Sequence, residues 1–313
     1  MRISTSNFSS NFLVQVQQLE QQQNTLQSQA STGLKVSLPE DDPSVMASVL
    51  NLQTASSANS QYKNNISQLQ SSAVTASGAM NSLQTISNRV NEIATLATSG
   101  TTSKDQLSSY ASEVSNLLQQ AVQLGNTQDA DGNYIFAGTQ SSTKPFTTTT
   151  DASNNVIAVN YQGNNDVASS EIAPNVTVSA QTPGANTGGS GPRGLFADSR
   201  YGADLFSHMI SLQQHLAAGN TTAISSTDAP ALSKDEQNII YQISANGVMQ
   251  STLSNANNIA AAKSTNLTAQ ISNETNADLA QTLVQLNQTQ TAYQAALQSG
   301  SKVMNLSLLD YLH

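Results

Sequence analysis

The side chains that could carry out chemistry are few in this chain, and they form no recognisable catalytic set. His208 and His215 lie seven residues apart, which places both on one face of a helix, as in a possible two-histidine metal site. No carboxylate lies at a supporting spacing, so we interpret both as solvated residues of a helix surface. A Ser-His-Asp arrangement has almost no candidate base, because His313 is the one other histidine. We therefore predict no metal site, no cofactor and no catalytic residue.

Two adjacent carboxylates, Asp41 and Asp42, would suit glycoside hydrolysis or an aspartic protease. Pro43 follows them, and proline favours the first position of a helix. Asp42 can then cap the free amides of that helix, while Asp41 adds negative charge at the positive end of the helix dipole. We interpret the pair as a helix start. The glycine-rich run at 188–191 lacks the strand, helix and lysine of a phosphate-binding loop, so we interpret it as a linker.

Composition excludes further classes of function. The 313 residues carry 11 Lys and Arg against 20 Asp and Glu, a formal charge of -9, and the basic residues are spread along the chain. Nucleic-acid binding is therefore not expected, because it needs clustered Lys and Arg. The absence of cysteine excludes disulfides, thiolate metal sites and cysteine nucleophiles. No apolar run is long enough for a cleaved signal peptide or a membrane span, so we expect no membrane contact.

Two stretches, one near each end of the chain, repeat apolar residues at the alternating spacing of a heptad seam, and each seam includes one glutamine. One reading is that each is an ordinary amphipathic helix on a globular core. We favour another, because the flanking positions are mostly Gln, Ser, Asn and Thr, and such helices are marginal alone. We predict that both ends are largely disordered in the monomer and order in an assembly. The candidate interface residues are Phe12, Val16, Leu19, Gln23, Leu26, Leu279, Leu283, Leu286, Gln290, Tyr293 and Leu297.

The two glutamines suggest how the ends could find their register. If the seams pack antiparallel with their centres aligned, Gln23 and Gln290 fall in the same or adjacent layers. Two buried amides can satisfy each other and fix the register of a helix pair.

Between the ends, the pattern predicts helices at about 44–98, 104–126 and 203–218. A capping box at Ser233–Glu236 predicts the start of a last long helix, with breaks near Gly247 and Asn273. Strands are expected at Tyr134–Phe136, from Val156 to Tyr161, and at 176–178. The Gly- and Pro-containing run 181–194 is expected to be a flexible connection.

The predicted fold is mainly α, an elongated bundle of long helices with terminal coiled-coil helices and a small β-rich insertion domain. We expect residues 1–42 and 270–313 to form the terminal coiled-coil region. Residues 43–127 and 200–269 would form a helical rod, and 128–199 the β-rich surface insertion.

Several segments resemble flagellin-type axial proteins. They are Met1-Arg2-Ile3-Ser4-Thr5, the segment 33–43, and the ending Leu306-Ser307-Leu308-Leu309-Asp310-Tyr311-Leu312. The Asp-Pro step and the run Gly132-Asn133-Tyr134-Ile135-Phe136-Ala137-Gly138, followed by Pro145-Phe146, are most similar to the hook-filament junction (hook-associated protein 3) branch of this family. The residues that carry this resemblance are Asp41, Asp42, Pro43, Tyr134, Phe136, Gly138, Pro145 and Phe146.

The resemblance implies a structural adaptor and not an enzyme. Such a protein is secreted through the flagellar type III export apparatus and joins the flagellar hook, through hook-associated protein 1, to the flagellin filament. Its terminal helices form a ring of copies in the axial assembly, and a cytoplasmic export chaperone covers them beforehand. The nearest alternative is a flagellin-type filament subunit. A second alternative, from another class, is a secreted enzyme with its activity in residues 128–200.

Overall fold

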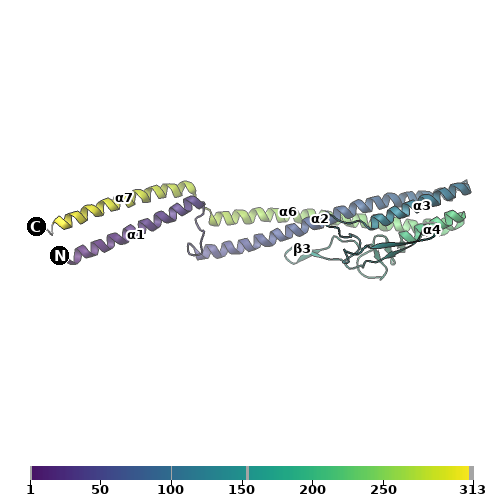
Figure 1. Ribbon diagram of the computed structural model, residues 1–313, viewed down its shortest axis with the longest axis horizontal. Helices are drawn as coiled ribbons and strands as arrows, with labels where there is room; N and C mark the ends of the chain where they lie inside the picture. The colour runs from purple at the N-terminus through teal and green to yellow at the C-terminus, as the bar shows by residue number, and fades with distance from the viewer. Residues whose placement is uncertain (1, 100, 153–154, 310–313) are drawn as a thin grey trace. The chain divides into compact units, whose positions relative to one another are not determined.

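Helices make up most of the chain, which confirms the predicted mainly α fold with a small β-rich insertion. The computed structural model describes residues 2–99, 101–152 and 155–309, with side chains described from 10 to 302 in those ranges. No helix there is long and apolar enough to cross a membrane. The long helices, labelled in Figure 1, are α1 (Arg2–Thr32), α2 (Pro43–Ala97), α3 (Lys104–Gly125), α4 (Leu205–Ala218), α6 (Ala229–Thr275) and α7 (Leu279–Leu309).

The chain divides into two compact units. Residues Met1–Ala58 and Lys263–His313 form one, which we call the terminal unit, and Asn59–Ala262 form the other, the central unit. The terminal unit contains α1 and α7, which lie side by side in Figure 1. The central unit contains α3, α4, the β strands and the longer parts of α2 and α6.

The helices of the central unit follow the predicted periodicity. In α2, apolar residues that recur at three- and four-residue steps are buried, among them Ile66, Met80 and Leu83. α2 packs against α6, where the side-chain amide of Asn59 donates to the carbonyl oxygen of Ala260 at 2.8 Å. The start of α3 is fixed by a capping box, in which Ser103 and Gln106 satisfy each other's backbone amides.

The start of α6 differs from the prediction. The helix begins at Ala229 and not at the capping box Ser233–Glu236, and it continues through Gly247. The break predicted near Asn273 is confirmed, because α6 ends at Thr275 and α7 begins at Leu279. A short α5 (Thr221–Ala223) and a π-helix, η1 (Ile224–Asp228), precede it without a break. Asn220 caps this run by accepting from the amide of Ala223, so the helical backbone is already nucleated before Ser233.

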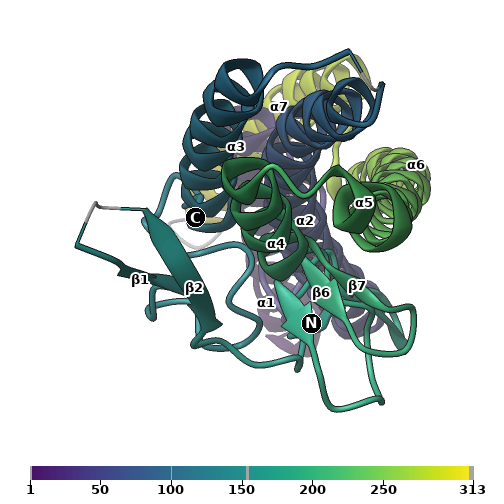
Figure 2. The same ribbon diagram turned by 90° about the vertical axis from the view of Figure 1, so that its right-hand side faces the viewer.

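The β-rich region consists of three small sheets. β1 (Phe146–Thr150) and β2 (Val156–Tyr161) form one antiparallel hairpin, and β3 (Ser170–Ala173) and β4 (Val176–Val178) form another. In the third sheet β6 (Ala197–Asp198) lies between β5 (Ala185–Asn186), parallel to it, and β7 (Ala203–Asp204), antiparallel to it. Figure 2 shows β6 and β7 beside α4, and β2 of the hairpin packs against α4 and α3.

Two predictions for this region are wrong. Tyr134–Phe136 is not a strand, since Tyr134 makes a single bridge to Gln128 and turns follow it. The run 181–194 is not a flexible connection throughout, because 183–186 are buried and contain β5. The amide of Gly184 donates to the carbonyl oxygen of Phe136 at 2.8 Å. The chain uses its Gly and Pro residues here for close packing and not for mobility.

Four phenylalanines form the centre of the β-rich region. Phe146 lies 4.9 Å from Phe196 and 5.1 Å from Phe206 between ring centroids, and the rings of Phe196 and Phe206 stack at 5.0 Å. Phe136 meets Phe196 edge-on at 5.7 Å. Aromatic burial of this kind dominates core energetics. Phe206 belongs to α4, so the cluster attaches the strands to the helices.

Glycines allow this close approach. A Cβ on Gly125, at the end of α3, would lie 2.7 Å from the ring of Phe146, and a Cβ on Gly184 would lie equally close to the same ring. Both positions therefore need a residue without a side chain.

We expect Phe146→Ala to destabilise the central unit by about 3–5 kcal/mol, because it removes a buried ring and leaves a cavity between three aromatic neighbours. The matched control is Ile157→Ala on the neighbouring strand, whose side chain is 47% exposed and should cost less than about 0.5 kcal/mol. Urea unfolding followed by circular dichroism measures both. Equal effects from the two variants would show that this cluster does not hold the unit together.

Candidate assembly interface

The terminal unit is built on an antiparallel pair of helices. A Cβ on Gly300 of α7 would collide with the ring of Phe12 in α1. At the other end of the pair, the amide of Lys35 donates to the carbonyl oxygen of Thr275 at 2.7 Å, and Leu34 forms an isolated bridge with Asn276. Gly33, at a φ of 74°, ends α1 in the left-handed conformation that favours glycine. These contacts fix the register of α1 against α7.

The proposed interface residues of α1 lie along the face that meets α7. Phe12, Val16, Leu19 and Gln23 are partly buried, and Leu26 is 5% exposed. Another apolar face of the same helix remains open, because Leu13 and Val14 are more than half exposed. One side of α1 is therefore covered within the chain and another is not.

The proposed interface residues of α7 are divided between two faces. Leu286, Gln290 and Tyr293 are partly buried, but the side chains of Leu279, Leu283 and Leu297 are 48%, 51% and 44% exposed. The positions that are buried instead include Thr282 and Thr289. The face of α7 that packs on α1 has residues at heptad spacing. They are Thr282, Leu286, Thr289, Tyr293, Ala296 and Gly300.

Sequence reasoning missed Thr282 and Thr289 because two sets of positions on α7 obey the heptad spacing. The predicted set and the packed set share Leu286, Tyr293 and Gly300. Threonine, alanine and glycine are smaller than leucine, so the face that contains them lets α1 approach closely. The larger leucines are left on the outside. An apolar surface with no partner within the described residues is therefore present on this helix pair.

The two seam glutamines lie at neighbouring levels of the pair, between the contact of Phe12 with Gly300 and the bridge of Leu34 with Asn276. Both are partly buried. Among the described side chains, no hydrogen bond joins Gln23 to Gln290, so mutual pairing of the two amides stays a prediction. The ending at 306–312, which carries part of the family resemblance, lies outside the described side chains.

The predicted helix start at Asp41, Asp42 and Pro43 is confirmed. One carboxylate oxygen of Asp42 accepts from the amides of Ser44 and Val45 at 3.0 and 3.1 Å, and Pro43 is the first residue of α2. Asp41 closes the preceding turn, since its carboxylate accepts from the amides of Ser37 and Leu38, both at 2.9 Å. These backbone hydrogen bonds lower the pKa of Asp41 below its ordinary value.

The other motif residues lie in the core of the central unit. Phe136, Gly138, Pro145 and Phe146 are buried, and Tyr134 is partly buried. Gly138 has a φ of 67°, and a Cβ there would clash with Asn164. These residues act on the fold of the β-rich region and not on an exposed contact surface.

The interpretation of the two histidines as solvated is wrong. His208 Nδ1 lies 2.7 Å from Asp235 Oδ2, and His215 Nδ1 lies 2.7 Å from Asp228 Oδ2. Both carboxylates are almost fully buried, and Ser211 donates a further hydrogen bond to Asp228. Asp235 also accepts from the amide of Asp204 at 2.8 Å. The pairs join α4 to η1 and α6.

Sequence reasoning missed these partners because they come from a separate segment. The signal that could have found them is that Asp228 and Asp235 are seven residues apart, as the histidines are. Within the described ranges, no group of three or more His, Cys, Asp or Glu residues could hold a metal ion. The hydrogen bond with Asp235 raises the pKa of His208, and burial raises the pKa of Asp235.

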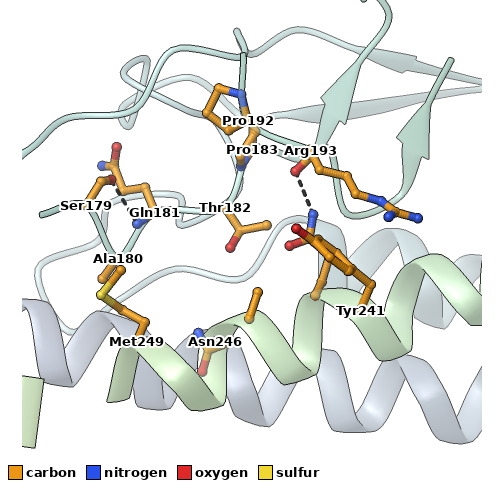
Figure 3. A pocket seen from close by; sticks show the side chains of 12 residues that line it. Ser179, Ala180, Gln181, Thr182, Pro183, Pro192, Arg193, Tyr241, Asn246 and Met249 are labelled. Atoms are coloured by element: carbon orange, nitrogen blue, oxygen red, sulfur yellow. Dashed lines mark hydrogen bonds between the residues drawn. The ribbon is translucent and has the colours of Figure 1, made fainter. Parts of the chain in front are cut away.

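A cavity of about 250 Å³ lies between α6 and the loops of the β-rich region (Figure 3). Its lining contains no Asp, Glu, His or Lys. The guanidinium of Arg193 is not free for chemistry, because it stacks between the rings of Tyr201 and Tyr241 at 3.5 and 4.3 Å. Gln242 of the cavity wall donates to the carbonyl oxygen of Arg193. The cavity offers no acid–base pair for catalysis.

Comparisons with known proteins give one consistent family. Residues 3–141 match the bacterial flagellin N-terminal helical region. The flagellar hook-associated protein 3 of Escherichia coli (strain K12) is 33% identical over 118 residues, 38% of this chain and 37% of that protein. The protein of the same name from Salmonella typhimurium is 29% identical over 146 residues, 47% of this chain and 46% of that protein. The matched part of the chain thus spans less than half of these relatives.

Solved structures share the fold. A putative flagellar hook-associated protein from Vibrio parahaemolyticus superposes with a TM-score of 0.64 at 18% identity, covering 75% of this chain and 100% of that one. FlgL from Xanthomonas campestris gives 0.56 at 18% identity, covering 71% and 99%. Together with the sequence matches, they confirm the predicted resemblance to flagellin-like axial proteins of the hook-associated protein 3 kind.

The pair formed by His208 and Asp235 makes stability depend on pH. The pKa of His208 is raised on folding, so its stabilising effect is complete below the ordinary histidine value of about 6.5 and is lost as pH rises through the raised value. We expect His208→Gln to cost about 1.5 kcal/mol near pH 6 and less near pH 9. Urea unfolding at the two pH values measures the difference. Gln214→Ala on an exposed position of α4 is the control, and an equal loss at both pH values would contradict the prediction.

Proposed function

We propose that this chain is a structural adaptor of the bacterial flagellum that joins the hook to the filament and assembles through its terminal helices. The observation that carries the proposal is the exposed apolar surface of the terminal unit. Leu279, Leu283 and Leu297 lie open on α7 although threonines of the same helix are buried. The similarity to hook-associated protein 3 over part of the chain supports the same role.

Burial of these leucines would supply the free energy of assembly. Covering one exposed leucine side chain contributes about 1.5–3 kcal/mol. Charge can add little, because Glu20 is the one charged residue between Arg2 and Lys35, and α7 has none between Asp278 and Lys302. The terminal helices therefore associate through apolar shape, and 1–42 with 270–313 act as the assembly region.

The partners follow from the proposed position in the flagellum. Hook-associated protein 1 would contact one side of the adaptor, flagellin subunits the other, and further copies of this chain would complete a ring. Export through the flagellar type III apparatus would leave the protein outside the cell. A cytoplasmic chaperone would cover the exposed leucines before export, because an apolar surface of this kind self-associates. The proposed function is structural and not enzymatic.

A flagellin-type filament subunit is the second candidate, favoured by the match to the flagellin N-terminal helical region. Seeded polymerisation separates the two. A filament subunit elongates a seed without limit, whereas an adaptor adds a limited number of copies and stops.

Deletion of the gene tests the adaptor proposal directly. We expect hooks without filaments by electron microscopy, together with unassembled flagellin in the medium. Normal filaments on the deletion strain would refute the role at the junction.

We expect the double variant Leu279→Gln and Leu283→Gln to lose attached filaments when it replaces the native chain in that strain. Both side chains are about half exposed, so the fold of the protein should be unchanged while the apolar contact is lost. Ile157→Gln, on an equally exposed apolar residue of β2, is the matched control and should restore motility. Full motility of the double variant would show that these leucines are not an assembly contact.

A further inference from the structure

The outer face of α6 carries a second heptad seam, opposite the face that packs on α2. The face toward α2 is buried through Ile239, Leu253 and Ala260, whereas the buried Gln242 and Asn246 line the cavity against the loops of the β-rich region. The outer seam steps four and three residues in alternation, and all its positions are exposed. Its members are Tyr241, Ala245, Val248, Thr252, Asn255, Ile259 and Ala262.

Large apolar side chains protrude from this seam. The exposed fraction is 51% for Tyr241, 69% for Val248 and 70% for Ile259. Thr252 presents its methyl group as well, because its hydroxyl already donates to the carbonyl oxygen of Val248 at 3.0 Å. α6 itself has no charged residue between Glu236 and Lys263, and the guanidinium of Arg193 lies over the ring of Tyr241 at one end of the seam. Depletion of charge is typical of the core of a protein interface.

α2 carries a seam of the opposite shape on its own outer face. Its residues are small or short, all are exposed, and they show the same alternating steps. They are Ser67, Ser71, Val74, Gly78, Asn81, Thr85 and Asn88. This stretch is also without charge, since no charged residue lies between Lys63 and Arg89.

Gly78 is the informative residue of the α2 seam. A glycine inside a helix costs about 1 kcal/mol relative to alanine. Here a Cβ on Gly78 would meet nothing within 4 Å, so no contact within the described chain requires a glycine. The small residue leaves room at the surface for a side chain from outside the chain.

We infer that the outer face of α6 docks onto the outer face of α2 of a second copy of this chain. Protruding Val248 and Ile259 would insert between the small residues of the α2 seam, as knobs insert into holes in a coiled coil. Copies with a net charge of -9 repel each other, and these two stretches of helix, which have no charged residue of their own, can meet at little electrostatic cost. Asn255 and Asn81 give each seam a polar position that can set the register.

The contact joins two different faces, so each copy keeps one free face for the next. Such a heterologous contact builds a ring or a helical array and not a closed dimer. Within one chain, Gln250 Nε2 lies 3.5 Å from the carbonyl oxygen of Ala73, which marks the common level of the two helices. Copies at the same level would therefore bring Val248 close to Val74 and Gly78. This contact rests on the proposed function in that it supplies the sideways contact of the assembled ring.

Disulfide trapping tests the contact, because the chain has no native cysteine. The deletion strain receives the full chain with Gly78→Cys and Val248→Cys together, or with Val74→Cys and Val248→Cys to cover a shift of one turn. After mild oxidation of the assembled flagella, non-reducing gels report the products. We expect a ladder of dimers, trimers and larger species from at least one of the two pairs, and none from Gly78→Cys alone.

The matched control pairs Gly78→Cys with Ser254→Cys, an exposed position of α6 off the outer seam, and should stay monomeric. Dimers from Val248→Cys alone would show that α6 meets α6 and would overturn the inference. So would monomers from both pairs while filaments are attached. Monomers from both pairs, with filaments attached, would leave the adaptor role supported. A ladder of cross-linked species in a system whose deletion strain keeps normal filaments would refute the adaptor role and still support this contact.

Discussion

The constraint on which the structure depends is that its helices are joined by apolar and small residues at heptad spacing, with very little help from charge. Charged residues make up 10% of the chain, against roughly 25% in a typical domain. Partner choice in coiled coils normally relies on charges beside the seam. Here partner choice depends on the size of the seam residues, so that a face of small residues on α7 packs on α1 within the chain.

The few charged contacts that exist are placed where apolar packing alone would be ambiguous. His208 with Asp235 and His215 with Asp228 hold α4 against the helical run that begins in η1, at matched spacing on both sides. A buried carboxylate is costly unless it is paired, so these contacts tolerate no shift of one helix along the other. They fix the position of Phe206 and, through it, of the aromatic cluster that holds the β-rich region.

Local signals in the sequence were sufficient where the decisive contacts are local. The helix predicted at 44–98 is found at Pro43–Ala97 because Asp42 and Pro43 mark its start without help from the rest of the chain. The predictions failed where distant segments decide the outcome. The carboxylate partners of the histidines lie on the π-helix and α6, and the run 181–194 is ordered by a hydrogen bond to Phe136 from a different part of the chain.

At the candidate interface, the sequence pattern could not tell which face of α7 packs within the chain. Periodicity identified α7 as a seam helix, but it could not choose between two steppings that share Leu286, Tyr293 and Gly300. Within the chain, the face with Thr282 and Thr289 is the one that packs on α1, because its small residues let α1 come close enough to place Phe12 over Gly300. A helix that buries its threonines and exposes its leucines leaves its larger apolar groups in water, which is the reason for proposing a partner beyond its own chain. The exposed leucines thus support the proposed assembly more strongly than the heptad spacing does, and the burial of the threonines is the reason the leucines are exposed.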